Sequence, residues 1–533
     1  MKIKRADRAI TASATAAVVL TAAACSGGGG VAGSSGQDLV SGGSLTVGLN
    51  SDPGNLDPQR SVNGPNLLIG VFAYDTPVTL LDSGQPAPQV VTAWKPGKHS
   101  YSLTVRKGVT CSDGTPMDAK TVADNISYVG AAKNGSPMTG VAVPAGTTAK
   151  ADPATGVVDV SLTTDAPFFM QNLAELPLIC EKGLADRKSL AKASAGSGPY
   201  VLSEAVPGDH FTYVLRKGYT WGPNGASTSA TGVPAKLTFK VVTSPTTTAN
   251  LLLSGQINVA QVSGANTTRL RGARVFSAGS MFMGQELAFN EAGGEAASDV
   301  AVRRALISAL NMPDLAKIDT GGNGKAANGL VADPKICSGD TMAGNVPAFA
   351  PDQAKAALDQ AGWAAGPDGI RHKGGRALSL SLIFANDEPT TAATAEYISA
   401  QWKKLGADVK LNEQSFDQTS AVVFGKGSWG ATLIGLGVSN PATLVPFFSG
   451  PAPTGGNNFG HVDNSGYDDL VAKASAQDGT AGCANWNAAE SALFKNSDIT
   501  PISNKPLLYW GKGAKFQVLA HVLIPTSLRA TRG

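Results

Sequence analysis

The chain has 533 residues, of which 42% are hydrophobic and 16% are charged, and its formal net charge is +3. This excess belongs to the first 24 residues, which hold four Lys or Arg and one Asp, so the remainder is formally neutral. A nucleic-acid partner would favour a basic surface, which this composition does not predict. The length exceeds what one hydrophobic core normally organises, so several domains are expected in a globular body.

Residues 1–24 have the layout of a secretory signal peptide, because basic residues come first and Ala9–Ala24 carries no charge. That apolar stretch of 16 residues is short for a membrane span, which needs about 20. It ends in three alanines before Cys25 and resembles a bacterial lipoprotein signal, although Ala22 stands where such signals usually carry Leu. The resemblance implies lipidation of Cys25 and anchoring to the membrane, and export with a free Cys25 is the alternative.

Residues 25–42 are rich in glycine and serine and contain little that could bury a core. A flexible chain of this length explores roughly 20–25 Å. The segment is therefore predicted to be a tether that holds the folded body just off the membrane.

The body begins with alternating strand-like and helix-like patterns. Apolar residues recur at every second position from Tyr101 to Val105, which predicts a strand with one buried face. An Asp-Gly turn and a Thr-Pro step follow, and apolar residues at helical spacing from Val122 to Val129 then predict a helix.

The same pattern returns later in the chain. Apolar residues at helical spacing run from Ala395 to Leu405, Gly406 predicts the end of that helix, and Val409 and Leu411 predict the face of a following strand. Mixed strands and helices throughout the chain indicate an α/β or α+β class.

No local motif predicts an enzyme, a metal site or a cofactor. The segment GGNGKAANG at 321–329 lacks the spacing and the Ser or Thr of a phosphate-binding loop, and is predicted to be a surface loop. Metal-binding and nucleophile motifs are absent from the sequence. The five histidines are isolated from one another: His99, His210, His372, His461 and His521.

Several short stretches, in order, carry a resemblance that spans nearly all of residues 44–533. They are NLDPQ (55–59), GQPAPQVVTAW (84–94), YSLTVRKGVTCSDGTPMDAKTV (101–122), GSGPYVL (196–202), RKGYTW (216–221), LLLSGQINVA (251–260), LAFNE (287–291), DVAVRRALISALNMPDL (299–315), AKAALDQAGW (354–363) and DGIRHKGG (368–375). Together they resemble the family 5 extracellular solute-binding proteins of ABC importers, of the oligopeptide- and dipeptide-binding type.

The resemblance implies an α/β fold of the two-lobed periplasmic-binding-protein type II, with a subdomain inserted in lobe I. The expected segments are 43–65, 196–281 and 498–533 for lobe I, 66–195 for the inserted subdomain and 282–497 for lobe II. It also implies a monomeric receptor on the extracytoplasmic face of the cell membrane, which captures peptides or peptide-like compounds for an ABC permease and ATPase. The alternative is a sensor or a cell-envelope assembly protein that kept the fold without transport.

Four cysteines lie beyond the predicted tether, and outside the cytoplasm four spaced cysteines suggest two disulfides among three pairings. The pairs Cys111–Cys180 and Cys337–Cys483 are favoured because each would fall within one predicted domain. Buried free thiols are the alternative.

Peptide-binding members of the family fix the ligand's N-terminal ammonium with an Asp in a segment of the form W-x-A-D-Y-x-[DE]-P. The matching stretch here is LIGLGVSNP at 433–441, and the Asp position falls on Gly437. Free-amine peptides are therefore disfavoured unless Asp52 or Glu286, which match cleft-facing positions, compensates. A slip of a few residues in this glycine-rich match is the alternative.

The resemblance assigns further residues to the ligand-binding wall, each of which could instead belong to the core. They are Asn50, Pro53, Gly54, Met138, Met281, Ser415, Phe416, Ile434, Gly435 and Ser439. Such a wall is less aromatic and less charged than that of a peptide receptor. It predicts a ligand held by backbone hydrogen bonds and apolar contact, such as a blocked peptide or another small amphiphile.

Overall fold

The computed structural model describes residues 39–532, except 62, 265, 332, 334, 335, 338, 387, 388, 426, 439, 454 and 520. The predicted signal peptide, Cys25 and most of the predicted tether lie outside the described residues. From Leu39 onward the chain forms one compact unit. Within the described part of this unit, no helix is long and apolar enough to cross a membrane.

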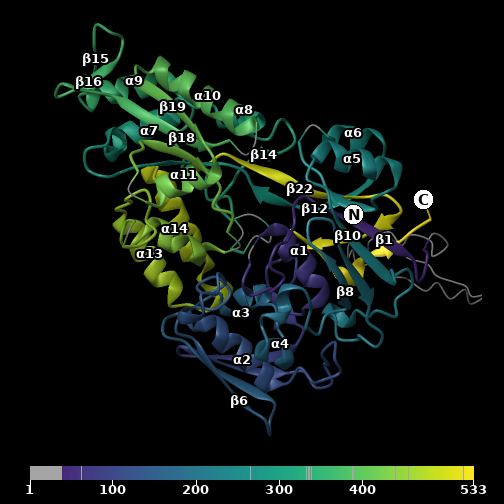
Figure 1. Ribbon diagram of the computed structural model, residues 1–533. Helices are drawn as coiled ribbons and strands as arrows, with labels where there is room; N and C mark the ends of the chain where they lie inside the picture. Colours follow the sequence, from purple (N-terminus) through teal and green to yellow (C-terminus); the bar gives the residue numbers. More distant parts are fainter. Residues whose placement is uncertain are drawn as a thin grey trace, which may run out of the picture. The chain divides into compact units, whose positions relative to one another are not determined.

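An eight-stranded sheet collects strands from distant parts of the chain. Its members are β1 (Ser44–Leu49), β8 (Tyr200–Val206), β9 (His210–Leu215), β10 (Lys236–Val241), β11 (Val259–Gln261), β12 (Phe276–Met283), β14 (Lys325–Ala326) and β22 (Ser503–Gly511). The order is β12-β22-β11-β1-β10-β9-β8, with β14 beside β22. Figure 1 shows the C-terminal β22, in yellow, alongside the teal β12, with which it pairs antiparallel. The three segments predicted for lobe I supply most of these strands.

Helix α1 (Gly64–Ala73) packs against this sheet and contributes to its core. Pro65 stands at its first turn, and the Asn63 side chain caps it by accepting a hydrogen bond from the backbone N–H of Asn66. Phe72 contacts Phe239 of β10 edge-on, with ring centroids 5.0 Å apart. The outer face of α1 lines a cavity.

A five-stranded sheet lies within the segment predicted for lobe II, apart from one strand. Its members are β13 (Glu286–Phe289), β18 (Ser379–Ala385), β19 (Asp408–Gln414), β20 (Ala431–Ile434) and β21 (Ile499–Pro501), in the order β19-β18-β20-β13-β21. Strand β21 belongs to this sheet although the sequence placed its residues in lobe I. The lobe boundaries stay a prediction.

Helices pack on this second sheet (Figure 1): α7 (Val300–Ser308), α8 (Met312–Asp319), α9 (Pro351–Gln360) and α10 (Pro389–Lys404). Helix α10 and strand β19 are the helix and strand predicted on either side of Gly406. Trp402 of α10 is fully buried and donates its indole N–H to the Leu306 carbonyl at 3.0 Å. This bond fixes α10 to α7 across the core.

A four-stranded sheet forms the centre of the predicted inserted subdomain. Its strands are β4 (Val91–Gly97), β5 (Ser100–Val105), β6 (Thr148–Asp152) and β7 (Val157–Ser161), in the order β4-β5-β7-β6. The predicted strand at 101–105 is β5, and the predicted helix is α2 (Ala119–Gly130), whose cap Asp118 accepts from the Thr121 N–H at 2.9 Å.

The remaining elements are short or peripheral. They are β2 (Val78–Leu80), β3 (Pro86–Pro88), α3 (Phe169–Asn172), α4 (Glu181–Ala185), α5 (Pro245–Ser254), α6 (Asn266–Gly272), β15 (Ala364–Ala365), β16 (Arg371–Lys373), β17 (Arg376–Ala377), α11 (Phe416–Val423), α12 (Val445–Phe448), α13 (Ser465–Ser475), α14 (Cys483–Asn496), β23 (Ala514–Lys515), β24 (Val518–Leu519), β25 (Val522–Leu523) and β26 (Arg529–Ala530).

Two chain passages, β12 to β13 and β21 to β22, connect the two large sheets and run side by side. The Gly284 N–H donates to the Ser503 carbonyl at 2.8 Å, and the Ile502 N–H donates to the Gln285 carbonyl at 2.9 Å. A Cβ atom at Gly284 would lie 2.1 Å from the Ser503 hydroxyl, so only glycine fits this close approach.

The described part of the chain contains two disulfides, and they join the pairs that the sequence favoured. Cys111 is bonded to Cys180 with Cα atoms 6.1 Å apart, and Cys337 is bonded to Cys483 with Cα atoms 4.8 Å apart. The first bond lies within the predicted inserted subdomain, and the second ties a loop to the start of α14 in the predicted lobe II.

Candidate ligand-binding cavity

A cavity of about 1290 Å³ lies where the eight-stranded sheet, the inserted subdomain and the loops of the five-stranded sheet meet. Its wall includes α1, the segments 138–145 and 164–177, the segment 436–438, and the C-terminal residues 519 and 521–526. Ligand pockets in proteins commonly measure roughly 300–1,000 Å³. The space is therefore large enough for a ligand of several residues.

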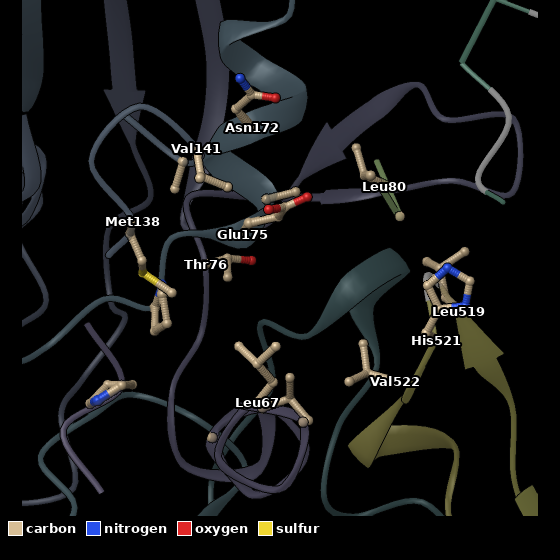
Figure 2. A pocket seen from close by; sticks show the side chains of 18 of the residues that line it. Leu67, Thr76, Leu80, Met138, Val141, Asn172, Glu175, Leu519, His521 and Val522 are labelled. Atoms are coloured by element: carbon tan, nitrogen blue, oxygen red, sulfur yellow. The ribbon is translucent and has the colours of Figure 1, made fainter. Parts of the chain in front are cut away.

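Apolar side chains make up much of the wall. In Figure 2, Leu67 of α1 and Val522 lie across the cavity from Asn172. Met138 and Val141 lie on the left of this view. Leu67 is 38% exposed and Val141 45% exposed, although both are hydrophobic. Exposed apolar side chains that gather in a concave surface are typical of a site that buries an apolar ligand.

Asp75, just after α1, is the most enclosed carboxyl group of the wall. It is 3% exposed and accepts four side-chain hydrogen bonds, from Gln89, Ser197 and Tyr219 at 2.8 Å each and from the indole N–H of Trp221 at 2.9 Å. Burial raises the pKa of Asp75, and these four donors lower it. Burial is the larger effect, so the pKa of Asp75 lies above its ordinary value.

A cluster of polar side chains connects β12 to the C-terminal stretch of the wall. The Asp333 carboxylate accepts from the Met281 N–H at 2.8 Å, and His521 Nδ1 lies 2.7 Å from the Ser280 hydroxyl. The imidazole also meets the Phe282 ring edge-on, with centroids 5.3 Å apart. Burial lowers the pKa of His521, so the ring is neutral at pH 7.

Glu286 does not line the cavity but bonds a segment that does. Its carboxyl is fully buried, and its Oε2 accepts from the backbone N–H of Leu436 at 2.8 Å. Leu436, Gly437 and Val438 line the cavity. Burial raises the pKa of Glu286 to about 8, and the charge of the neighbouring Asp319 adds to this rise.

The residues that the sequence assigned to the wall divide into three groups. Asn50, Met138 and Gly437 line the cavity. Ser439 lies outside the described residues. The others are absent from the lining: Asp52, Pro53, Gly54, Met281, Glu286, Ser415, Phe416, Ile434 and Gly435. Their part in ligand binding stays a prediction.

Local interactions explain the positions of several residues in the last group. Asp52 accepts hydrogen bonds from the N–H groups of Gly54 at 2.6 Å and of Gly208, so its carboxylate serves a turn. Ser415 caps α11, and Phe416 at the start of that helix is 62% exposed.

Sequence reasoning missed Asp75, Glu175, Asp333 and His521, which all line the cavity. None belongs to a local motif, and the fold brings them together from distant segments. Among the described residues, no group of three or more His, Cys, Asp or Glu could hold a metal ion.

The chain is similar to known proteins both in sequence and in fold. The family model described as bacterial extracellular solute-binding proteins, family 5 Middle, matches residues 85–456. Protein XP55 of Streptomyces lividans is 27% identical over 487 residues, covering 87% of this chain and 84% of its own. The periplasmic murein peptide-binding protein MppA of Escherichia coli is 26% identical over 513 residues, covering 88% and 89%.

A solved structure also resembles this chain. The substrate-binding protein of Microbacterium hydrocarbonoxydans, complexed with 4-hydroxybenzoate hydrazide, superposes with a TM-score of 0.70 at 24% identity, covering 92% of this chain and 100% of that one. At this identity the likeness concerns the fold.

Proposed function

Because this chain belongs to the bacterial extracellular solute-binding proteins of family 5, we propose that it captures a peptide-like or otherwise amphiphilic small molecule in the described cavity. The observation that carries the proposal is the cavity of about 1290 Å³ with a largely apolar wall.

Family membership by itself establishes the coarser function. The chain is a solute-binding protein of the ABC-importer type, its relatives are extracytoplasmic binding receptors rather than enzymes, and its fold is the two-lobed type II fold of periplasmic binding proteins. The family, the fold class and the non-enzymatic role predicted from the sequence are therefore confirmed. The particular ligand and the membrane anchor belong to our proposal.

The wall at Gly437 supports a ligand without an ammonium anchor. Gly437 lines the cavity with a φ of +50°, and a Cβ atom there would lie 3.2 Å from the Phe282 ring. Glycine provides only backbone groups at the position where the family's peptide receptors carry an Asp. The carboxylates of Asp75 and Asp333 accept hydrogen bonds from protein donors.

We expect a tripeptide amide with a free N-terminal amine to bind less than about fivefold more tightly than its N-acetylated amide. Where an ammonium makes a charged hydrogen bond, its loss costs on the order of 1.5–3 kcal/mol, or roughly 10- to 150-fold in affinity. Calorimetry with the matched pair measures the difference. Native ligand recovered from gently purified protein by mass spectrometry identifies the physiological solute.

The other outcomes separate the alternatives. A tenfold or greater preference for the free amine would show that a carboxyl group of the wall anchors the ammonium. If neither peptide binds and a non-peptide compound is recovered, the peptide-like ligand is wrong and the receptor serves another solute.

The proposal includes a lipid anchor at Cys25, an extracytoplasmic place on the cell membrane, and a monomer that hands its ligand to an ABC permease and ATPase. The support is the sequence from the basic N-terminus to the three alanines before Cys25. A lipid with a loose tether would keep the receptor at high effective concentration near its permease.

Cys25→Ser is expected to release the protein into the medium or to block its processing. Cell fractionation and intact-mass measurement report the two effects, and Ser26→Ala serves as the control. Unchanged membrane retention together with unchanged mass would rule out lipidation at Cys25.

A further inference from the structure

The charges of the cavity wall have one sign. Among the lining residues that the structure describes, there is no Lys or Arg, whereas four carboxyl groups are present: Asp75, Asp165, Glu175 and Asp333. His521 is the basic side chain of the described lining, and burial keeps its imidazole neutral. Nothing on the described wall therefore offers a positive charge to a ligand.

Two arginines, Arg187 and Arg216, are engaged within the protein. Arg187 pairs with Asp57 at 2.7 Å, and its guanidinium lies 3.8 Å from the centroid of the Tyr128 ring. Arg216 donates to the carbonyl of Ser197 at 3.0 Å and lies over the Trp221 ring. Neither arginine lines the cavity. Both guanidinium groups are therefore occupied by contacts within the protein.

An anion that entered this cavity would lose its hydration without gaining a cationic partner. Burial of an unpaired charge is strongly unfavourable, and nearby carboxylates add like-charge repulsion. Neutral ligands pay neither cost. A cationic ligand would gain from the negative field even where no carboxylate is free to bind it directly.

We infer that this cavity excludes anions, so that its ligand is neutral or cationic and carries no free carboxylate, phosphate or sulfonate. This rests on the proposed function only in that the described cavity is the ligand site. The prediction about the free amine concerns the N-terminus of a peptide ligand. This inference concerns the other end, because a peptide ligand would have to be blocked at its C-terminus.

Two fluorescent amphiphiles with the same aromatic skeleton provide the test. N-phenyl-1-naphthylamine is neutral, and 8-anilino-1-naphthalenesulfonate is its anionic counterpart. Titration of the full mature protein at pH 7 is expected to show that the sulfonate binds at least about tenfold more weakly than the neutral dye.

Variants at Leu67 separate charge from simple hydrophobicity. This exposed side chain lines the cavity from α1. Leu67→Lys adds a cation, and Leu67→Gln is the matched neutral control. The neutral-to-sulfonate affinity ratio is expected to be at least about fivefold smaller in Leu67→Lys than in Leu67→Gln.

Equal binding of both dyes to the unmodified protein, an equal ratio in the two variants, or no binding of the neutral dye would each overturn the inference. An N-acetylated tripeptide, compared as free acid and as C-terminal amide, distinguishes this failure from failure of the peptide proposal. Dyes that obey the charge rule while neither peptide binds would reject the peptide and retain the exclusion of anions.

Discussion

Replacement of Asp75 by alanine is expected to lower the free energy of unfolding by about 3–5 kcal/mol. The substitution removes the acceptor of four buried hydrogen bonds and leaves the donors of Gln89, Ser197, Tyr219 and Trp221 without that partner. These donors come from the predicted inserted subdomain and from the loops beside the eight-stranded sheet. The change therefore loosens the junction that forms one side of the cavity.

Urea denaturation at pH 7, followed by tryptophan fluorescence, measures this loss. Asp82→Ala is the matched control, because Asp82 is an exposed carboxylate in the same part of the chain. Tyr219→Phe removes one of the four bonds and should cost about 1–2 kcal/mol. A loss for Asp75→Ala within about 0.5 kcal/mol of that for Asp82→Ala would mean that the network contributes little to stability.

The elements that the sequence predicted correctly carry their signal locally. Strand β5 shows alternation from Tyr101 to Val105, and α2 shows helical spacing from Val122 to Val129. Each buries its apolar face against neighbours in one core, so the pattern of a few residues suffices. The topology came instead from the resemblance, because strand order over hundreds of residues leaves no local pattern.

The cavity was predicted less completely because its wall is assembled from loops. His521 lies between the short strands β24 and β25, and nothing in the neighbouring sequence shows that it meets Ser280. Among the positions transferred by resemblance, Asn50 beyond β1 lines the cavity. At Asp52 the side chain bonds a turn and at Ser415 it caps a helix, and their part in ligand binding stays a prediction.

Glu286 shows the intermediate case, since the resemblance assigned it to the ligand but the structure places it behind the lining segment. Its carboxyl accepts from the Leu436 N–H, and Asp319 on α8 supplies the charge that acts on it across the passage between the sheets. Asp319 itself accepts from the Ser503 hydroxyl and the Gln285 N–H. A change in the charge of Glu286 therefore alters its hydrogen bond to the cavity wall and its interaction with Asp319 beside that passage.

Stability is expected to fall as pH rises through the range set by Glu286. The pKa of this carboxyl is about 8 in the folded chain, above its ordinary value of 4.5. Between these values the folded state holds a proton that the unfolded chain has lost, so this stabilisation is complete below pH 4.5. It decreases by about 1.4 kcal/mol per pH unit and is gone above pH 8.

Glu286→Gln removes the titration while keeping an oxygen that can accept from the Leu436 N–H. At pH 8.5 the variant should be more stable than the unmodified protein by about 3–5 kcal/mol, and at pH 5 the two should differ by less than about 1 kcal/mol. Urea denaturation from pH 5 to 9 gives this difference directly, with the exposed Glu413→Gln as the control for loss of one carboxyl group.

Because Leu436–Val438 lines the cavity, neutral-dye affinity should fall above pH 8 in the unmodified protein and stay level in Glu286→Gln. A stability difference that is constant across this pH range would contradict the buried proton.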